Sequence, residues 1–414
     1  MDIKGVLKEE LKRVSLNKEE ILELNKLAEE ILLKLRKIGV RAFIGGSLAK
    51  NTLIRKNIQD IDIFVVFENE KETGKLEGVL KKAGLEAKVV HGSRDYLHIQ
   101  KGNIIFELIP VVKFKTPEEA ENVTDFSLLH VDYVKKKINK KPKIAEEIKL
   151  AKVFCYAQNC YGAESYIKGF SGYALELLVI NFGSFAGFLK NIIKLAGKDK
   201  KEKIVIDSEK QFKNKQMILS EINESKLSSP IVLIDPTYKY RNVCAGLSDE
   251  TFGVFIEAAK IFLKRPSLDF FEFKKFDEKR SEKIASVKKA KLIKIKLETS
   301  KQEGDIAATK MKKFFEFMIN EFEKKEQKVI DKEFVYDNGQ EAKGYLILKE
   351  NNEILVRGPK KEMKEAVKSF KLVHKKVAEK AGFVWAKKKI SLEEIFAYLH
   401  RFEDEMAVRF KLLD

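Results

Sequence analysis

The stretch FIGGSLAKNTLIRKNIQDIDIFVVF, residues 43–67, decides the fold of this chain. Its second half is an apolar run that carries two carboxylates, Asp60 and Asp62, and a Gly-Gly-Ser turn at residues 45–47 precedes them. Because residues two apart in a strand point to the same face, both carboxylates share one face and the isoleucines beside them point to the other. An apolar strand does not carry two acids unless something pairs with their charge, so we expect cations here.

A second apolar stretch, NIIFELIPVV at residues 103–112, contributes one more acid, Glu107. If the two strands are neighbours, three carboxylates converge where the sequence supplies no balancing arginine. Like charges packed this closely require cations, and carboxylate oxygens are the ligands that Mg²⁺ prefers. Two such ions could bridge the three acids and clamp the attacking and leaving oxygens of a phosphoryl displacement.

The Gly-Gly-Ser turn adds a phosphate site to this metal site. Glycines let backbone amides approach a phosphate closely, and the helix expected after the turn offers its positive N-terminus. Taken singly, the turn is a common strand-to-helix connection and the paired acids are a common edge-strand cap. The combination with a later strand acid is much more specific, and it favours phosphoryl-transfer chemistry.

Length and charge set wider bounds. The chain has 414 residues and a mass of 47.6 kDa, enough for about three domains. Its 81 Lys and Arg against 63 Asp and Glu give a net charge of +18. Such a surplus favours a polyanionic partner, nucleic acid or an anionic membrane surface, and a Lys-rich or thermophilic proteome is the alternative.

Three further patterns exclude classes of protein. The three cysteines have no metal-ligand spacing, so we expect neither a zinc site nor a disulfide framework. No apolar run approaches the length of a membrane span, and the N-terminus has no signal-peptide core. We therefore expect a cytoplasmic protein with no membrane partner.

Hydrophobic periodicity predicts the order of elements. A helix over 17–38 has a capping box from Asn17 and Glu20, and helix and strand alternate through about residue 115. After a basic connector at 135–144 the pattern is helical, with one buried helix expected over 169–189. From residue 288 the order strand, helix, strand, strand predicts a βαββ unit, and the stretch from Arg357 onward is predicted to be helical and basic.

Three further stretches narrow the family. They are YGAESYIKGFSGYALELLVINFGSF at 161–185, DPTYKYRNVCAGLS at 235–248 and RPSLDFF at 265–271. Together with the carboxylate strands they resemble the class I CCA-adding enzymes of archaea, which are tRNA nucleotidyltransferases of the polymerase β-like superfamily. The resemblance runs from about residue 17 to 272 and continues more weakly after that.

The resemblance implies an α+β multidomain fold. A polymerase β-like nucleotidyltransferase head would span residues 1–137, and a helical, nucleotide-binding neck would span 138–268. A C-terminal α/β body with a basic helical tail would span 269–414 and bind tRNA. The chain ends earlier than longer members of the family, so we expect a shortened body domain.

The resemblance also implies an activity and its site. The activity is template-independent addition of CCA to the 3′ end of tRNA from CTP and ATP, with two Mg²⁺ ions held by Asp60, Asp62 and Glu107. The acceptor–TΨC arm of tRNA would be the partner, and a homodimer is left open. The expected nucleotide-binding residues are Gly46, Ser47, Lys50, Ser127, His130, Lys152, Tyr161 and Arg241.

Within that set the resemblance implies that Arg241 faces the incoming base. A guanidinium offers a fixed fork of donors, which suits the acceptors on a cytosine or adenine edge. Several positions depart from the family pattern. Glu107 stands where Asp is usual, Lys50 where Arg is usual and Ser127 where Thr is usual. Ser93 and Arg94 replace a Glu-His pair, which leaves open the contact that the family makes there.

The basic C-terminal segment has two readings. A lysine-rich helix face is most often merely solvated. As a functional surface it would contact tRNA phosphates and read A-form shape more than sequence. The lysines expected to do so are Lys360, Lys361, Lys371, Lys375 and Lys376.

Two other functions compete with CCA addition. A poly(A) polymerase-like RNA nucleotidyltransferase, or an oligoadenylate synthetase, belongs to the same superfamily, and nucleotide choice would separate it. A non-catalytic tRNA-binding protein on this scaffold belongs to another class. The retention of all three acids argues against that last alternative.

Overall fold

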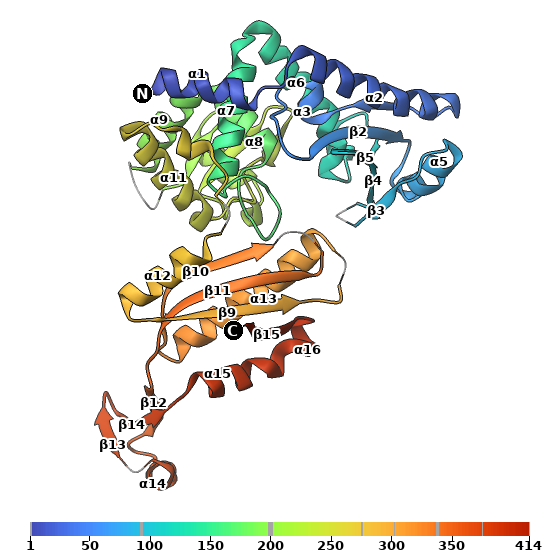
Figure 1. Cartoon of the computed structure of the whole chain (residues 1–414). Coiled ribbons are helices and arrows are strands. Elements are labelled where there is room, and N and C mark those ends of the chain that lie inside the picture. The colour runs from blue at the N-terminus through green and yellow to red at the C-terminus, as the bar shows by residue number, and fades with distance from the viewer. Residues whose placement is uncertain are drawn as a thin grey trace. The chain divides into compact units, whose positions relative to one another are not determined.

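The structure is a computed structural model that describes residues 2–91, 94–197, 202–274, 276–301, 303–336, 339–374 and 376–413. Helices and strands are mixed along the chain, which confirms the expected α+β class (Figure 1). The chain divides into two compact units, Met1–Lys274 and Lys275–Asp414. The parts that we expected as head and neck lie together in the first unit.

The first unit is organised around a five-stranded sheet with the order β1-β2-β5-β4-β3. The two central strands, β2 and β5, run parallel, and the other neighbours are antiparallel. Short helices join these strands. The bounds are β1 (Ala42–Ile44), α3 (Gly46–Ala49), β2 (Gln59–Phe67), α4 (Glu70–Thr73), α5 (Leu76–Lys82), β3 (Lys88–Val90), β4 (Tyr96–Lys101) and β5 (Ile104–Val112).

One face of this sheet is covered by α2 (Lys18–Lys37), which confirms the predicted helix. The predicted capping box is present: Asn17 Oδ1 accepts from the backbone N–H of Glu20 at 2.8 Å, and Glu20 Oε2 accepts from that of Asn17 at 2.7 Å. The apolar stripe of α2 packs with the fully buried Ile61 and Ile63 of β2. The carboxylates between them therefore point away from α2.

Helices and a small sheet complete the first unit. Their shared core contains a cluster of phenylalanines around Phe154. The three-stranded sheet has the order β6-β7-β8. The bounds are α1 (Ile3–Val14), η1 (Pro117–Glu119), η2 (Val123–Phe126), α6 (Ser127–Lys140), α7 (Lys143–Ala157), α8 (Gly172–Phe182), α9 (Phe185–Ala196), β6 (Ile204–Ile206), α10 (Lys215–Glu221), η3 (Glu224–Lys226), β7 (Ile231–Asp235), β8 (Tyr238–Asn242), α11 (Asp249–Lys264) and η4 (Leu268–Phe271).

Two predictions for this region are wrong. The stretch over 169–189 is not one buried helix but two, α8 and α9, bent by 90°. Gly183 ends α8 with a positive φ of 77°, and Ser184 begins α9 by accepting from the backbone N–H of Gly187 at 3.0 Å. The basic connector is helical as well, because α6 continues to Lys140 and Pro142 caps α7.

The helices α8 and α9 are an apolar pair that bears on membrane crossing. Among the described residues no single helix has the length and apolarity to cross a membrane. This pair reaches both limits only when its two helices are counted together across their bend.

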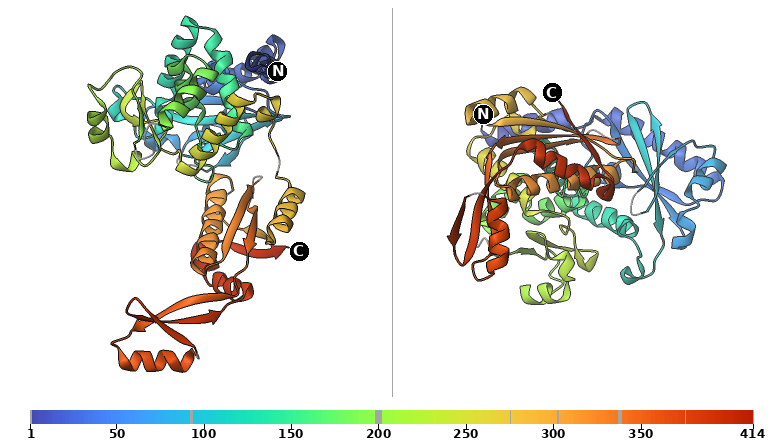
Figure 2. Two further views of the ribbon diagram at one scale, coloured as in Figure 1. Left: turned by 90° about the vertical axis from the view of Figure 1, so that its left-hand side faces the viewer. Right: turned by 90° about the horizontal axis from the view of Figure 1, so that it is seen from below.

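The second unit contains the predicted βαββ arrangement. Its four-stranded sheet has the order β10-β11-β9-β15, with α12 and α13 on opposite faces (Figure 2). Met311, Phe314 and Phe315 of α13 are fully buried against it. The bounds are α12 (Glu278–Lys288), β9 (Lys291–Glu298), α13 (Asp305–Lys324), β10 (Lys328–Tyr336), β11 (Glu341–Lys349), α15 (Leu392–Leu399), η5 (His400–Phe402), α16 (Glu403–Met406) and β15 (Arg409–Leu413).

The prediction of a helical tail from Arg357 onward is wrong over most of its length. Among the described residues between 353 and 389, only α14 (Lys364–Val373) is a long helix. The rest forms a sheet with the order β12-β14-β13, made of Glu353–Lys360, Phe383–Lys389 and Val377–Lys380. Ala381 and Gly382, with φ of 49° and 77°, form the tight turn between β13 and β14, where positive φ at both positions suits a hairpin.

Candidate active site

The three expected carboxylates meet on neighbouring strands. β2 and β5 pair in parallel, with Asp62 beside Glu107 and Asp60 beside Ile105. The expectation that the two acid-bearing strands are neighbours is thereby confirmed. Asp60, Asp62 and Glu107 are partly buried on the face that α2 does not cover.

Two of these acids have partners that the sequence analysis missed. Lys56 Nζ lies 3.0 Å from Asp60 Oδ2, and His98 Nε2 lies 3.1 Å from Glu107 Oε1. The sequence analysis expected no balancing arginine, and the partners found among the described residues are a lysine and a histidine. Lys56 stands four residues before Asp60, and His98 faces Glu107 from β4, so only the first of these was visible locally.

Asp62 differs from its two neighbours. Among the described residues its carboxylate makes no hydrogen bond and no ion pair. Burial, the negative charge of Glu107 and that of Asp60 raise the pKa of Asp62 to about 6, although Lys50 and Lys152 act in the opposite direction. A carboxylate in this condition gains most from an added cation.

The donor set around Asp62 bears on metal binding. Over the described ranges, no three His, Cys, Asp or Glu side chains are arranged to hold a metal ion. The chemistry of the donors nevertheless fits, because an unpartnered carboxylate between two other acids offers hard oxygen ligands to a divalent cation. Asp60 and Glu107 would exchange Lys56 and His98 for that cation.

The Gly-Gly-Ser turn lies directly against the carboxylate strand. A Cβ on Gly46 would lie 1.6 Å from Asp62 Oδ2, and one on Gly45 would lie 2.0 Å from the ring of Phe64. Gly46 also has a positive φ of 54°. The backbone of the turn can reach this position only without side chains, and it brings Ser47 to the same edge. The helix that follows, α3, is a single turn.

Lys50 and Lys152 are brought together by a buried acid. Lys50 Nζ lies 2.7 Å from Glu176 Oε2, and Lys152 Nζ lies 2.8 Å from Glu176 Oε1. Thr52 Oγ1 donates to Glu176 Oε1 at 3.0 Å. The Glu176 side chain is fully buried, and that of Lys152 is 4% exposed. The cluster ties the segment after the Gly-Gly-Ser turn to helices α7 and α8.

Glu176 is ionised in this surrounding. Burial alone would raise its pKa, but Lys152 and Lys50 lower the pKa of Glu176 to about 2. Burial lowers the pKa of Lys152 despite this partner. The sequence carried a signal for Glu176, because it interrupts an otherwise apolar helix without a local partner.

Tyr161 lies beside the same lysine. A Cβ on Gly172 would lie 3.0 Å from Tyr161 Oη and 3.8 Å from Lys152 Cε, so both expected residues approach the start of α8. Burial, Glu176 and Asp62 raise the pKa of the Tyr161 hydroxyl, which therefore stays protonated at neutral pH.

Arg241 and His130 form a second cluster in the first unit. Arg241 Nη1 lies 2.9 Å from His130 Nε2 and 3.0 Å from Asp235 Oδ2, and His130 Nε2 lies 3.0 Å from the same oxygen. Ser127 opens α6 one turn before His130. The structure thus brings Arg241 and His130 together. It adds Asp235, which the sequence analysis did not single out.

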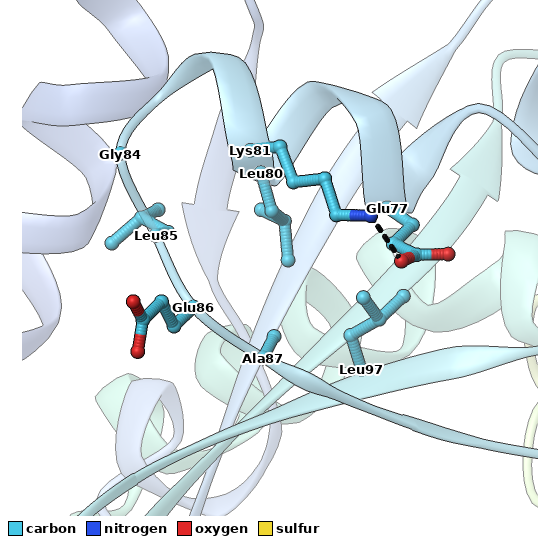
Figure 3. Close-up of a pocket in the computed structure, with 8 residues that line it drawn as sticks. All are labelled: Glu77, Leu80, Lys81, Gly84, Leu85, Glu86, Ala87 and Leu97. Carbon is cyan, nitrogen blue, oxygen red and sulfur yellow. Dashed lines mark ion pairs between the residues drawn. The ribbon is translucent and has the colours of Figure 1, made fainter.

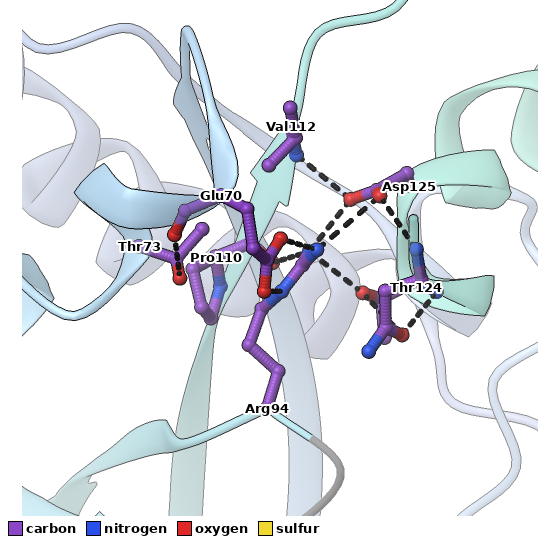
Figure 4. A network of polar contacts seen from close by, with 8 residues as sticks. Glu70, Thr73, Arg94, Pro110, Val112, Thr124 and Asp125 are labelled. Atoms are coloured by element: carbon purple, nitrogen blue, oxygen red, sulfur yellow. Dashed lines mark hydrogen bonds and ion pairs between the residues drawn. The ribbon is translucent and has the colours of Figure 1, made fainter. Parts of the chain in front are cut away.

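Arg94, one of the positions that departs from the family pattern, is engaged elsewhere. Its guanidinium pairs with Glu70, donates to Asp125 Oδ1 at 2.6 Å and donates to the carbonyl of Pro110 at 3.0 Å (Figure 4). The Arg94 side chain is 5% exposed. It therefore holds the end of β5 to the segment before α6. Ser93 lies outside the described residues.

A pocket between α5, the segment 84–87 and Leu97 of β4 is separate from these clusters (Figure 3). Its walls are apolar apart from the Glu77–Lys81 ion pair at 2.7 Å and the carboxylate of Glu86. None of the expected site residues is among its described lining residues. We assign it no role in nucleotide binding.

The expected tRNA-binding lysines lie in the second unit. Lys360, Lys361, Lys371 and Lys376 are exposed, and no ion pair joins them to a carboxylate within the described residues. Lys375 lies outside the described residues. The four lysines do not share one helix face, because only Lys371 belongs to α14 and Lys360 ends β12.

Two families of domains match the first unit. Residues 24–155 match the family described as nucleotidyltransferase domain. Residues 146–272 match the family described as tRNA nucleotidyltransferase, second domain. The first match contains all three carboxylates, and the second contains Glu176, Asp235 and Arg241.

Curated relatives of the chain are CCA-adding enzymes of archaea. The chain is 39% identical over 226 residues to that of Nanoarchaeum equitans, covering 53% of this chain and 55% of the relative. It is 32% identical to that of Sulfurisphaera tokodaii, covering 64% and 60%, and 29% identical to that of Methanocaldococcus jannaschii, covering 66% and 62%. The chain thus matches less than two thirds of the length of these relatives.

Solved structures show the same fold at lower identity. One is a cytoplasmic RNA terminal U-transferase, with a TM-score of 0.50 and 14% identity over 66% of this chain and all of that one. Another is Cid1 in complex with its short product ApU, with a TM-score of 0.51 and 12% identity over the same shares. At this identity the likeness concerns the fold alone.

Proposed function

We propose that this chain, whose residues 24–155 match the nucleotidyltransferase domain and whose residues 146–272 match the second domain of tRNA nucleotidyltransferase, adds CCA to the 3′ end of tRNA from CTP and ATP without a nucleic-acid template. The observation that carries the proposal is the edge at which Asp62, Glu107 and Asp60 meet beside a glycine turn. The net charge of +18 supports a polyanionic substrate. The curated relatives support tRNA as that substrate.

The three carboxylates would hold two Mg²⁺ ions, which stabilise negative charge on the transferred phosphoryl group when they are bound. The remaining contacts with the triphosphate would come from residues of the chain. The backbone amides of Gly46 and Ser47 can donate to the triphosphate at close range, since no side chain intervenes at residue 46. Lys50 and Lys152 supply positive charge next to them.

Arg241 would select the base. Within the described residues its guanidinium uses only Nη1 for Asp235 and His130, so Nε and Nη2 stay available as donors for the acceptors of a cytosine or adenine edge. Ser127 and His130 lie at the start of α6 next to it. Arg241→Ala should change the relative incorporation of CTP, ATP and UTP more than the affinity for tRNA.

For the second unit we propose contact with the acceptor–TΨC arm of tRNA through Lys360, Lys361, Lys371, Lys375 and Lys376. The division into a head over 1–137, a neck over 138–268 and a body over 269–414 belongs to the same proposal. So do a cytoplasmic location and a homodimer.

One assay tests the activity. Purified protein is incubated with tRNA lacking CCA, Mg²⁺ and labelled CTP, ATP or both, and the products are resolved at single-nucleotide length. We expect two CMP additions followed by one AMP, with tRNA that already ends in CCA left unextended. A run of AMP or UMP would instead indicate a poly(A) polymerase-like or uridylyl-transferring enzyme. Binding without any addition would indicate a non-catalytic tRNA-binding protein.

A further inference from the structure

Asp235, at the end of β7, is the centre of the cluster around Arg241. It is fully buried, and both its oxygens are occupied. Oδ2 lies 3.0 Å from Arg241 Nη1 and 3.0 Å from His130 Nε2. Oδ1 accepts from Tyr173 Oη at 3.1 Å and from Thr237, whose backbone N–H lies at 2.8 Å and whose Oγ1 lies at 2.7 Å.

The two oxygens have different tasks. The contacts of Oδ1 come from Thr237, two residues along the same turn, and from Tyr173 of α8, so they fix the carboxylate itself. Oδ2 then presents a charge to Arg241 from a fixed position. Because a guanidinium is planar, a contact that holds Nη1 also sets the directions of Nε and Nη2. The side chain of Arg241 is 22% exposed, which leaves room for a ligand on that side.

A stack of aromatic rings holds the other partner of Arg241. Tyr173 lies over His130 with ring centroids 3.9 Å apart, His130 lies 6.1 Å from Phe126, and Phe126 lies 5.3 Å from Tyr238. The interplanar angles of these three pairs are 23°, 15° and 18°, so each ring is nearly parallel to its neighbour. His130 therefore cannot tilt without disturbing the stack.

The carboxyl group of Asp235 is ionised at neutral pH. Burial opposes ionisation, but His130, Arg241 and the backbone of Thr237 lower the pKa of Asp235 to about 2. The carboxylate thus remains an anion that compensates Arg241 in a poorly solvated place.

We infer that Asp235 is a positioning residue for nucleotide choice, which acts by holding Arg241 so that its remaining donors face the incoming base. The inference rests on the proposed function, because it assigns a base to Arg241. It adds a residue that need not touch the nucleotide. A loosely held guanidinium can follow the acceptors of any base, whereas a fixed one accepts only those edges whose acceptors match its direction.

The test is nucleotide choice in the variant Asp235→Asn. Each nucleotide is supplied alone to tRNA lacking CCA, and kcat/KM is measured for CTP and UTP, together with the Kd of tRNA. We expect the CTP-to-UTP ratio to fall at least about tenfold, with CTP turnover reduced less and tRNA affinity unchanged. Glu209→Gln is the matched control, because Glu209 also accepts from a tyrosine hydroxyl, that of Tyr133 at 2.6 Å, and from a cation, Lys137 at 2.7 Å. That control should leave the ratio unchanged.

Two further variants guard against a mere loss of folding. Thr237→Val keeps the charge of Asp235 and removes one hydrogen bond to Oδ1, so the ratio should fall in the same direction by about twofold to threefold. In the Arg241→Ala background, Asp235→Asn should lower the ratio no further, because the residue acts through Arg241.

The outcomes separate this inference from the proposed function. An active wild-type protein whose ratio is unchanged in both Asp235→Asn and Thr237→Val would overturn the inference alone. So would an Asp235 effect that persists in full without Arg241. A wild-type protein that adds no nucleotide to tRNA lacking CCA would overturn the proposed function, and this inference with it.

Discussion

Two carboxylates of the first unit, Asp62 and Glu176, stand in opposite electrostatic conditions. Both lie on apolar elements, and Lys50 and Lys152 act on both. Glu176 takes these two ammonium groups directly, and its pKa falls to about 2. Asp62 receives only their more distant field and faces Glu107, and its pKa rises to about 6.

The difference distinguishes an acid that holds protein side chains in place from an acid that is available to a cation. An acid whose partners are all inside the protein fixes those partners in place, as Glu176 does for the lysines and Asp235 does for Arg241. An acid that lies among like charges destabilises the folded state. A cation bound from solution can remove this destabilisation. We therefore read Asp62 as the metal-directed member and Glu176 as the structural one.

The largest effect is expected from Asp62→Asn, which removes the negative charge of Asp62. Losing a metal ligand removes transition-state stabilisation of several kcal/mol, so CMP and AMP incorporation should fall at least about a thousandfold. tRNA binding should persist. Asp60→Ala should have a similar effect, and near-normal turnover in either variant would contradict the assignment of these acids to the metals.

The same variant predicts a gain in stability without metal. Since the pKa of Asp62 is raised in the folded protein to about 6, its charge destabilises the folded state above that pH. This penalty is relieved as the pH falls from 6 toward the unfolded value of about 4. Asp62→Asn should therefore raise Tm in EDTA at pH 7.5, and the gain should shrink by pH 5. A lower Tm at pH 7.5 would refute this assignment.

Glu107 sharpens the comparison on the neighbouring strand. Glu107→Gln removes the third negative charge, so nucleotide addition should fall on the order of a hundredfold. The pKa of Asp62 should also fall, because a like charge is lost. Glu107→Asp restores the acid usual in the family and should retain or improve activity. His98→Ala, which removes only the internal partner of Glu107, is the control and should leave turnover close to normal.

Glu176→Gln tests the acid that holds the two lysines. Breaking a buried ion pair leaves Lys50 and Lys152 uncompensated, so the free energy of unfolding should fall by about 3 kcal/mol. Because the pKa of Glu176 is depressed to about 2, its contribution is complete above its unfolded pKa and is lost as the pH falls from about 4.5 to 2. Urea unfolding at pH 7 and pH 3 measures the loss in the free energy of unfolding and its dependence on pH. An equal difference between variant and wild type at the two pH values would contradict the paired reading.

The smallest effects are expected from single lysines of the second unit. Lys360, Lys361, Lys371 and Lys376 have no internal carboxylate partner among the described residues, whereas Lys387 pairs with Glu353 at 2.9 Å. If the unpaired lysines contact phosphates, each one replaced should reduce the slope of log affinity against log salt by somewhat less than one unit. Lys387→Ala is the control and should leave the slope unchanged.

A matched pair of RNAs completes that measurement. Charge reversal of two or three of these lysines should weaken binding of full-length tRNA more than binding of a hairpin with the acceptor stem alone. Turnover at saturating substrate should stay near normal. If the slope of log affinity against log salt is unchanged for both RNAs, these lysines are ordinary solvated surface residues.

The sequence by itself determined the elements whose signals are local. Alternation placed Asp60 and Asp62 on one face of β2, and the capping box at Asn17 and Glu20 set the start of α2. The motifs also indicated the family. Each of these signals is written within a few residues, because a strand repeats every second residue and a helix cap spans three.

Local signals also failed where two readings compete. The lysine-rich tail reads as a helix by composition, yet the turn at Ala381 and Gly382 makes β13 and β14 a hairpin. Gly183 and Ser184 likewise divide an apolar run that periodicity alone extends through them. In the first case two residues with positive φ, and in the second a glycine with positive φ followed by a helix-capping serine, outweigh the pattern around them.

Only the tertiary structure decided which charges meet. Lys50 and Glu176 are 126 residues apart, and Arg241 and His130 are 111 apart. No local pattern encodes such a pair, because its energy depends on burial and on the distance between side chains that the chain brings together only by folding. For that reason the sequence could name the acids of the site, but only the fold could distinguish Asp62, whose carboxylate has no hydrogen-bond or ion-pair partner among the described residues, from Glu176 and Asp235, which have theirs.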